Sequence, residues 1–357
     1  MKVIVTGGAG FIGSNLIRHI INNTEASVIN IDKLTYASNL NSLKDISKNS
    51  RYKFKKACIT DKKAIQDIIF EEKPDAIMNL AAESHVDRSI DNPNIFLETN
   101  ILGTYNLLDC WLQYYKVASK DSNKRFIFHH ISTDEVYGDL ESNDPPFTEL
   151  SRYDPSSPYS ASKASSDHLV RSWSRTFGLP ILLTNCSNNY GPYHFPEKLI
   201  PHTIISALEL QNIPIFGDGS QRRDWLFVED HADALWTVLK EGKINETYNI
   251  GGGYEMTNLN VVKKICTYLD RAKPIVSKEF KSYHELISFV DDRPGHDFRY
   301  AINYSKIKDE LGWAPKKTFN DGLGLTIEWY LNNEAWWREI LDSHYELKRL
   351  GKSDETL

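Results

Sequence analysis

The stretch KVIVTGGAGFIGS, which runs from Lys2 to Ser14, decides the fold of this chain. Its β-branched residues predict a strand, and Gly7, Gly10 and Gly13 follow where an apolar helical pattern begins. Glycines between a strand and a helix allow a tight turn, and they let a pyrophosphate approach the N-terminus of the helix. A glycine-rich turn is often only a turn, so the surrounding sequence must decide what this one does.

The next strand-like run, SVINID, ends in Asp32. A carboxylate at that distance from the glycines accepts hydrogen bonds from an adenosine ribose and repels a 2′-phosphate. The small residues of AAESH, from Ala81 to His85, follow a further strand and would let a dinucleotide pass. We therefore expect a dinucleotide site that prefers NAD to NADP.

Apolar, β-rich runs alternate with helical patterns through residues 1–191. This alternation predicts the α/β class, with a Rossmann-type doubly wound parallel sheet that binds the cofactor. From 192 to 350 the pattern loosens into loops with short strands and helices, which predicts a smaller, mostly C-terminal substrate-binding lobe. Some later segments are expected to return to the main sheet. Residues 351–357 form a polar tail.

The composition limits the possible partners. The 357 residues are 41% hydrophobic and carry a net charge of -6, whereas a nucleic-acid or anionic-membrane surface would need clustered Lys and Arg. The chain has no apolar run of membrane-spanning length and no secretory leader before the first strand, so we expect a cytoplasmic protein. Scattered cysteines favour free thiols over disulfides or a metal site. They are Cys58, Cys110, Cys186 and Cys266.

Tyr159 and Lys163 lie four positions apart in YSASK, near the start of a helical pattern. They therefore share one face of the helix. An ammonium near a phenol lowers the pKa of the phenol, so the tyrosinate could act as a general base near neutral pH. The Tyr-x-x-x-Lys spacing is common by chance, but downstream of a glycine fingerprint it indicates a catalytic pair.

The run HHISTDEVYGDL places two acids, Asp134 and Glu135, directly after Thr133. Hydride transfer alone needs neither carboxylate. Adjacent carboxyl groups push their pKa values apart, so one can act as an acid and the other as a base. This chemistry does not say which is which, and acids that merely cap a helix or end a strand are the alternative.

TGGAGFIG, NLAAESHVD and YSASK resemble the extended branch of the short-chain dehydrogenase/reductase family. STDEVYGDL, CSNNYGPYHFPEKLIP, RRDWLFVEDHA and DRPGHDFRYAIN resemble its dTDP-glucose 4,6-dehydratases, and the resemblance extends from Met1 to about Trp337. It implies a lyase that makes dTDP-4-keto-6-deoxyglucose for deoxysugar synthesis, such as rhamnose supply. The implied reaction is oxidation at carbon 4, loss of water across carbons 5 and 6, and hydride return to carbon 6, with NAD regenerated.

The resemblance also implies roles for individual residues. Tyr159, paired with Lys163, is the base at the 4-hydroxyl. Glu135 is the base at carbon 5, Asp134 the acid on the departing hydroxyl, and Thr133 a hydrogen-bonding group at carbon 4. The implied cofactor contacts are Gly7, Gly10, Phe11, Ile12, Gly13, Asp32, Lys33, Leu34, Thr35, Cys58, Ile59, Leu80, Ala81, Ala82, Ser84, Thr99, Tyr159, Lys163 and Asn189.

A nucleotide sugar needs cationic groups for its diphosphate and apolar walls for its base. Arg223 in RRDW and Arg293 in DRPGH would be solubilising surface groups in an arbitrary chain, but the resemblance makes them substrate ligands. His296 has no metal-like neighbours, so no metal is expected and His296 is interpreted as a hydrogen-bond donor or a wall. The implied substrate contacts are Ser84, Thr133, Asn188, Lys198, Leu199, Pro214, Ile215, Phe216, Arg223, Asn258, Arg293 and His296.

One position departs from the family pattern. Its members usually carry Asp before Ile59, where the carboxylate would bond the adenine amino group, and this chain has Cys58. We therefore expect a modestly lower affinity for NAD.

NILGTYNLLDCWLQYY is apolar around most of its helical circumference, and the helix of Tyr159 carries a second stripe at Leu169 and Trp173. The corresponding helices of extended family members pair in a four-helix bundle, which predicts a homodimer. Complete burial within one subunit is the alternative.

Two other functions stay open at this point, a UDP-sugar epimerase or decarboxylase on the same scaffold and a non-catalytic dinucleotide-binding redox sensor. The sequence also does not decide whether the substrate carries thymidine or uridine, because one methyl group in an apolar pocket contributes only about 1–3 kcal/mol to binding.

Overall fold

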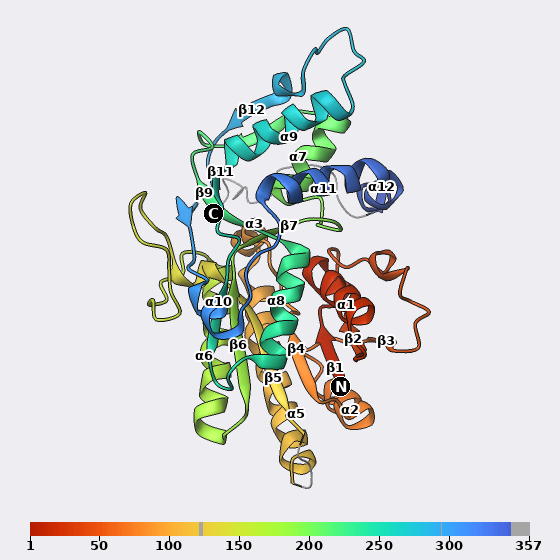
Figure 1. Cartoon of the computed structure of the whole chain (residues 1–357), viewed down its shortest axis with the longest axis vertical. Helices are drawn as coiled ribbons and strands as arrows, with labels where there is room; N and C mark the ends of the chain where they lie inside the picture. The colour runs from red at the N-terminus through yellow and green to blue at the C-terminus, as the bar shows by residue number, and fades with distance from the viewer. Residues whose placement is uncertain (121–123, 294, 344–357) are drawn as a thin grey trace.

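The computed structural model describes residues 1–120, 124–293 and 295–343 (Figure 1). Seven parallel strands form the main sheet in the order β10-β6-β5-β4-β1-β2-β3. The order reverses between β1 and β4, as in a doubly wound fold, so the predicted Rossmann-type sheet is confirmed. The strands are β1 (Lys2–Thr6), β2 (Ser27–Asp32), β3 (Tyr52–Lys56), β4 (Ala76–Asn79), β5 (Ile127–Thr133), β6 (Ile181–Cys186) and β10 (Thr247–Ile250).

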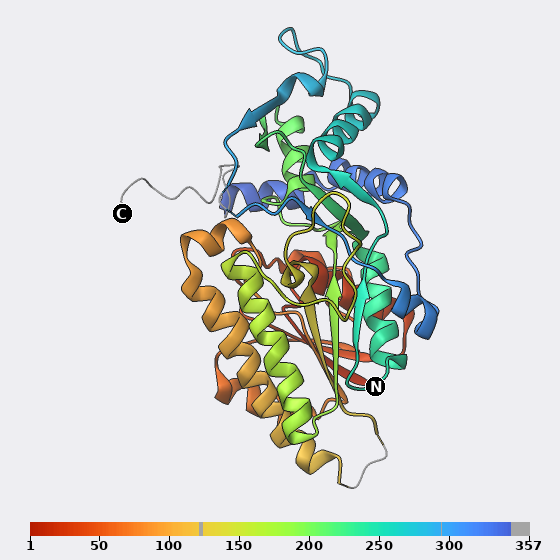
Figure 2. The ribbon, with the colours of Figure 1, turned by 90° about the vertical axis from the view of Figure 1, so that its left-hand side faces the viewer.

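Helices cover both faces of this sheet. α1 (Phe11–Asn23) and α8 (Val228–Glu241) pack side by side on one face. α2 (Lys62–Glu72), α5 (Gly103–Ala118) and α6 (Pro158–Phe177) cover the other. Figure 2 shows α5 and α6 on one side of the sheet and α8 on the opposite side.

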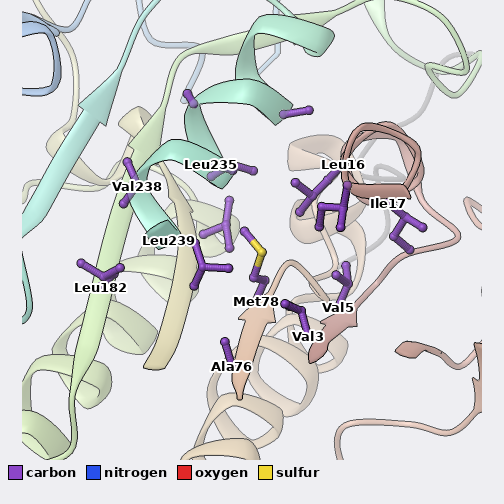
Figure 3. Packing of buried hydrophobic residues seen from close by; sticks show 14 of the residues in the cluster. Val3, Val5, Leu16, Ile17, Ala76, Met78, Leu182, Leu235, Val238 and Leu239 are labelled. Carbon is purple, nitrogen blue, oxygen red and sulfur yellow. The ribbon is translucent and has the colours of Figure 1, made fainter. Parts of the chain in front are cut away.

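The central strands are buried on both faces, so they lack polar alternation. Every residue of β4, β5 and β6 is buried. Each large apolar side chain buried here contributes about 1.5–3 kcal/mol. Figure 3 shows side chains of α1 and α8 packed over those of β1 and β4, including Leu16, Ile17, Leu235, Leu239, Val3, Val5 and Met78.

A smaller lobe lies above the main sheet in Figure 1 and has a hydrophobic cluster of its own. Its strands are β7 (Asn188–Tyr190), β9 (Arg222–Phe227), β11 (Glu255–Thr257) and β13 (Arg299–Tyr300) in one sheet, with β8 (Ile213–Phe216) and β12 (Ile287–Val290) in another. Its helices are α7 (Leu199–Leu208), α9 (Asn258–Ala272), α11 (Phe319–Asn332) and α12 (Glu334–Ser343).

The chain returns to the main sheet after residue 192, as expected. α8 packs against α1, β10 pairs with β6, and α10 (Ser305–Leu311) packs on both α8 and β10. The boundary at residue 192 stays a prediction, and the predicted polar tail, 351–357, lies outside the described residues.

Short helices connect these elements. They are η1 (Leu40–Leu43), α3 (Val86–Asp91), α4 (Pro93–Phe96), η2 (Leu97–Leu102), η3 (Asp134–Tyr137) and η4 (Tyr283–Leu286). The predicted helix that starts at Asn100 begins instead in η2, a π-helical turn, and becomes α-helical at Gly103. π-Helical turns are rare and often lie at functional sites, and periodicity alone does not reveal them.

The four cysteines are free thiols, as predicted, and Cys58 is the partly exposed one. Within the described part of the chain, no helix has both the length and the apolar character needed to cross a membrane.

Candidate active site

A cavity of about 470 Å³ lies at the carboxyl ends of the main-sheet strands, and residues of the smaller lobe line its other side. All five residues predicted to be catalytic line it, and so does every predicted substrate contact. The predicted cofactor contacts line it as well, with two exceptions, Leu34 and Cys58. Residues from distant parts of the sequence therefore line one cavity.

The glycine turn between β1 and α1 is built for close approach. Gly7 has φ of 70° and donates its backbone N–H to Ile31 O at 2.9 Å. A Cβ on Gly13 would lie 2.3 Å from Gly7 O, and one on Gly7 would lie 2.8 Å from the backbone of Ala81. Gly10 caps α1 without a side-chain hydrogen bond, which leaves backbone donors at the helix end for an anion. These features fit the pyrophosphate of a dinucleotide.

Asp32, at the end of β2, is held in place by its neighbours. Its Oδ2 accepts the backbone N–H of Ala9 at 3.0 Å, and its Oδ1 accepts the backbone N–H of Leu34 at 2.8 Å and the hydroxyl of Ser38 at 2.9 Å. A carboxylate fixed beside the glycine turn fits the ribose contact expected from the sequence.

The two predicted contacts outside the cavity lining stand directly beside residues that belong to it. Leu34 has a positive φ of 61° and lies between Lys33 and Thr35. Cys58 lies between Ala57 and Ile59, and its Sγ is 3.0 Å from Thr60 Oγ1. The structure thus does not bring these two side chains into the cavity with the others.

The acid pair follows β5 in the short helix η3. Thr133 caps this helix, since its Oγ1 accepts the backbone N–H of Glu135 at 3.3 Å and contacts Asp134 Oδ1 at 3.4 Å. The capping role therefore belongs to Thr133, while Asp134 and Glu135 line the cavity. This arrangement argues against the interpretation of the two acids as simple caps.

Tyr159 and Lys163 come from the first turns of α6. A capping box between Ser157 and Ser160, with Pro158 at the first helical position, fixes where this helix starts. Both catalytic candidates are buried on its inner face, and Lys163 Nζ donates to Ile131 O at 2.8 Å.

The structure does not give Tyr159 the lowered pKa that the sequence predicted. Burial and the nearby Glu135 carboxylate raise the pKa of Tyr159 well above its ordinary value, and a hydrogen bond with Thr133 only partly opposes them. The lysine ammonium bonds the carbonyl of Ile131 instead of the phenol. Removal of the phenol from water therefore outweighs the attraction of the cation.

The two acids lie in different electrostatic surroundings. Burial raises the pKa of Asp134 well above its usual range, and the charges of Glu135 and Asp224 raise it further. Burial also raises the pKa of Glu135, but Lys198, Arg223 and Arg293 oppose that rise. Asp134 therefore keeps its proton to higher pH than Glu135 does.

The cations come from the smaller lobe and its junction. Arg223 Nη2 donates to a backbone carbonyl at 2.9 Å, Lys198 Nζ to another at 3.1 Å, and Arg293 Nη1 lies 2.6 Å from Asp87 Oδ1. Carbonyls hold two of these cations without neutralising them, which leaves positive charge at the cavity wall. Such a wall suits a diphosphate.

The remaining substrate contacts stand at the ends of elements. Lys198 caps α7, Asn258 begins α9 behind the capping Thr257, and β8 presents Pro214, Ile215 and Phe216. His296 Nδ1 lies 2.6 Å from Asp292 Oδ1, and burial together with Arg293 lowers the pKa of His296 to about 4. His296 is therefore neutral at pH 7, and among the described residues no cluster of metal-ligating side chains is found.

Several lining residues were missed in the sequence. Glu197 accepts hydrogen bonds from Tyr36 OH at 3.0 Å and from Arg88 Nε at 3.1 Å, and the ring of His194 stacks on that of Phe11 at 4.0 Å. The ring stacking ties the loop before α7 to the start of α1, and the Glu197 contacts tie it to Tyr36 and to α3. Their partners are far apart in sequence, so no local spacing rule could have found them.

A family model described as GDP-mannose 4,6 dehydratase matches residues 4–326. A dTDP-glucose 4,6-dehydratase of Escherichia coli is 58% identical over 98% of this chain and 99% of its own length. The crystal structure of dTDP-glucose 4,6-dehydratase from Bacillus anthracis in complex with NAD has 42% identity and a TM-score of 0.83, covering 95% of this chain and 99% of that one. The enzyme from Streptomyces venezuelae with NAD bound has 39% identity and a TM-score of 0.86, covering 95% and 100%. Because these similarities extend over nearly the whole chain, it belongs to the dTDP-glucose 4,6-dehydratase family.

Proposed function

We propose that this protein is an NAD-dependent enzyme that converts dTDP-glucose to dTDP-4-keto-6-deoxyglucose. One observation carries the proposal: a single cavity is lined by the glycine turn, the Tyr159–Lys163 pair and the Asp134–Glu135 pair. Relatives at 58% and 56% identity are named for this activity, and a solved relative holds NAD.

NAD, held by the glycine turn and Asp32, would supply reversible hydride acceptance next to the sugar. The protein's own groups would move the protons. Tyr159 takes the proton of the 4-hydroxyl as carbon 4 is oxidised, with Thr133 hydrogen-bonded at the same oxygen. Because burial raises the phenol pKa, Tyr159 needs the nearby positive charge of Lys163 and of the bound cofactor to act as a base.

The acid pair would carry out the elimination. Once carbon 4 is a ketone, the proton on carbon 5 is acidic, and Glu135 removes it while Asp134 gives its proton to the 6-hydroxyl, which leaves as water. The opposed surroundings of the two carboxyls support this division, because Asp134 is the one that holds its proton more tightly.

The substrate would lie with its diphosphate against Arg223 and Arg293 and its base near β8. Arginine presents a rigid fork of N–H donors that matches phosphate oxygens. Pro214, Ile215 and Phe216 offer an apolar wall for the base.

The test is to incubate the purified protein with NAD and a panel of dTDP-glucose, UDP-glucose, GDP-mannose and UDP-glucuronic acid, and to determine the product masses. Loss of one water with formation of an alkali-sensitive 4-keto chromophore supports a dehydratase. An isomer of unchanged mass would indicate an epimerase, and loss of carbon dioxide from a uronic acid substrate a decarboxylase. Absence of turnover with every sugar nucleotide would leave only the redox-sensor alternative.

The same proposal includes a homodimer. Large apolar side chains are exposed along η2, α5 and α6, with Leu102 55% exposed, Phe177 47% and Tyr105 38%. Leu169 and Trp173 are partly buried, and Trp173 contacts the ring of Tyr105 at 5.8 Å. A second copy of this chain that presents the same two helices would cover this face.

A further inference from the structure

Asp167 lies one helical turn beyond Lys163 on α6 and is completely buried behind the cavity. Its Oδ2 accepts hydrogen bonds from Tyr153 OH at 2.8 Å, Ser132 Oγ at 3.0 Å and Asn185 Nδ2 at 3.4 Å. These donors come from the loop before α6 and from the two strands under it. A buried carboxylate with this many donors is held in a defined position.

The fourth neighbour of this carboxylate is His130, whose Nε2 lies 3.3 Å from Asp167 Oδ1. His130 Nδ1 faces the amide nitrogen of Asn79 at 3.1 Å, and Asn79 Oδ1 accepts from Thr6 Oγ1 at 2.7 Å. An amide nitrogen only donates, so Nδ1 is the acceptor and Nε2 carries the proton toward Asp167. Burial lowers the pKa of His130 to about 4, so this neighbour is neutral and does not balance the negative charge.

Lys163 lies one helical turn before Asp167 on the same buried face of α6, and its ammonium is the positive charge that acts on this carboxylate. Although burial alone raises a carboxyl pKa, the nearby His130 and the charge of Lys163 lower the pKa of Asp167 below its usual value. In turn, burial lowers the pKa of Lys163, and Asp167 is the main group that opposes this. The two buried charges therefore stabilise each other.

We propose that Asp167 is the counter-ion of Lys163 and, through it, a positioning residue of the reaction centre. The four side chains around Asp167 fix its carboxylate, the carboxylate keeps the lysine charged, and the Ile131 carbonyl directs the ammonium to the cavity edge. The kinetic part of this inference rests on the proposed function, but the electrostatic pairing does not.

The other groups around Lys163 cannot replace Asp167. Cys186 on β6 faces the ammonium, but burial raises the pKa of its thiol, which stays neutral. Tyr159 on α6 is protonated for the same reason, and His130 on β5 is neutral. Arg171 Nη2 donates to Tyr153 OH at 3.0 Å and so reaches Asp167 through that hydroxyl.

The kinetic test is the pH profile of kcat/KM for dTDP-glucose. Without its counter-ion, Lys163 loses its proton at lower pH, so Asp167→Asn should move the alkaline limb down by about 1 pH unit or more. Asp230→Asn is the matched control, because this buried carboxylate only accepts two backbone N–H groups, at 2.9 and 3.0 Å, outside the cavity lining. The control should lower stability and leave the limb in place. An unmoved limb in an active, folded Asp167→Asn variant overturns the inference.

A second test measures stability instead of turnover, and it does not require the single variant Asp167→Asn to fold. In Lys163→Met the carboxylate of Asp167 loses its counter-ion, and its folded-state pKa should rise above the unfolded value. For an acid this means that stability is lost as pH rises through the raised pKa. The thermal midpoint of Lys163→Met should therefore fall between about pH 4 and pH 8 relative to the parent.

Adding Asp167→Asn to Lys163→Met should abolish that extra fall, because no unpaired charge is left. If the two variants and the parent share the same pH dependence of the thermal midpoint, Asp167 and Lys163 are not coupled and the inference fails. Wild-type turnover is measured in parallel. Failure of turnover alone contradicts the proposed function and leaves the thermal result to decide the pairing.

Discussion

Asp87 Oδ1 lies 2.6 Å from Arg293 Nη1, although 206 positions separate the two residues. Asp87 is in α3, beside the main sheet, and Arg293 belongs to the smaller lobe, so this ion pair joins the two sides of the cavity. Breaking a fully buried pair from one side costs about 3–5 kcal/mol, because the other charge stays behind unpaired, and the cost is smaller here because the Arg293 side chain is 21% exposed.

Arg293→Met should therefore lower the thermal midpoint and also raise the KM for dTDP-glucose at least about tenfold, which corresponds to about 1.4 kcal/mol. Adding Asp87→Asn should restore much of the thermal midpoint without restoring the KM. Arg222→Met, at the exposed first residue of β9, is the control and should change neither quantity. Recovery of both quantities in the double variant would show that Arg293 acts only on folding.

Glu135→Gln should stop the elimination and leave the oxidation at carbon 4. NADH absorbance should form on bound substrate while kcat falls about 10²–10⁴-fold, the range expected for loss of a general base. Single-turnover absorbance and product mass measure the two steps separately. Near-normal turnover of this variant would show that Glu135 is not the base at carbon 5.

Asp134 makes stability depend on pH in a known direction. Its folded pKa is raised, so the folded state is favoured while the group is protonated and loses stability as pH rises through the folded pKa. Asp134→Asn should therefore raise the thermal midpoint at pH 9 more than at pH 5, while activity is lost. Scanning calorimetry across this range checks it, and an equal gain at both pH values would contradict a buried, proton-holding carboxyl.

Cys58→Asp should strengthen NAD binding by a few fold, the scale of one added hydrogen bond of about 0.5–1.5 kcal/mol. Cys58 does not line the cavity as the structure stands, but its neighbours Ala57 and Ile59 do. Cys58→Ser separates loss of the thiol from gain of the carboxylate. Isothermal titration calorimetry with NAD gives the affinities. Equal affinities of the parent, Cys58→Asp and Cys58→Ser would show that this position does not contact the adenine.

Leu102→Glu should convert the proposed dimer to a monomer, because a charge would be placed in the apolar face along α5 and α6. Leu150→Glu is a suitable control, since Leu150 is 94% exposed on a loop that precedes α6. Light scattering after size-exclusion chromatography reports the mass. If the wild-type protein has the mass of a single chain, the dimer proposal is wrong.

Much of the fold could be predicted because its causes are local. The turn at Gly7 needs a positive φ, the central strands are continuously apolar, and Tyr159 and Lys163 share a helix face through their spacing. The sequence did not clearly predict β3, because this edge strand contains no fully buried residue and its apolar and polar residues alternate only weakly.

Site residues that belong to a short motif could be predicted from the sequence. Contacts between charged residues of separate segments could not. The sequence by itself determined the α/β class, the glycine turn, the adjacent acids and the helical spacing of the Tyr-Lys pair, because each depends on residues within a few positions of one another. Only the tertiary structure decided that Asp87 pairs with Arg293 and that the pKa of Tyr159 is raised, because burial outweighs any nearby positive charge. Removal from water and through-space attraction depend on which segments fold over a group, and no spacing along the chain contains that information.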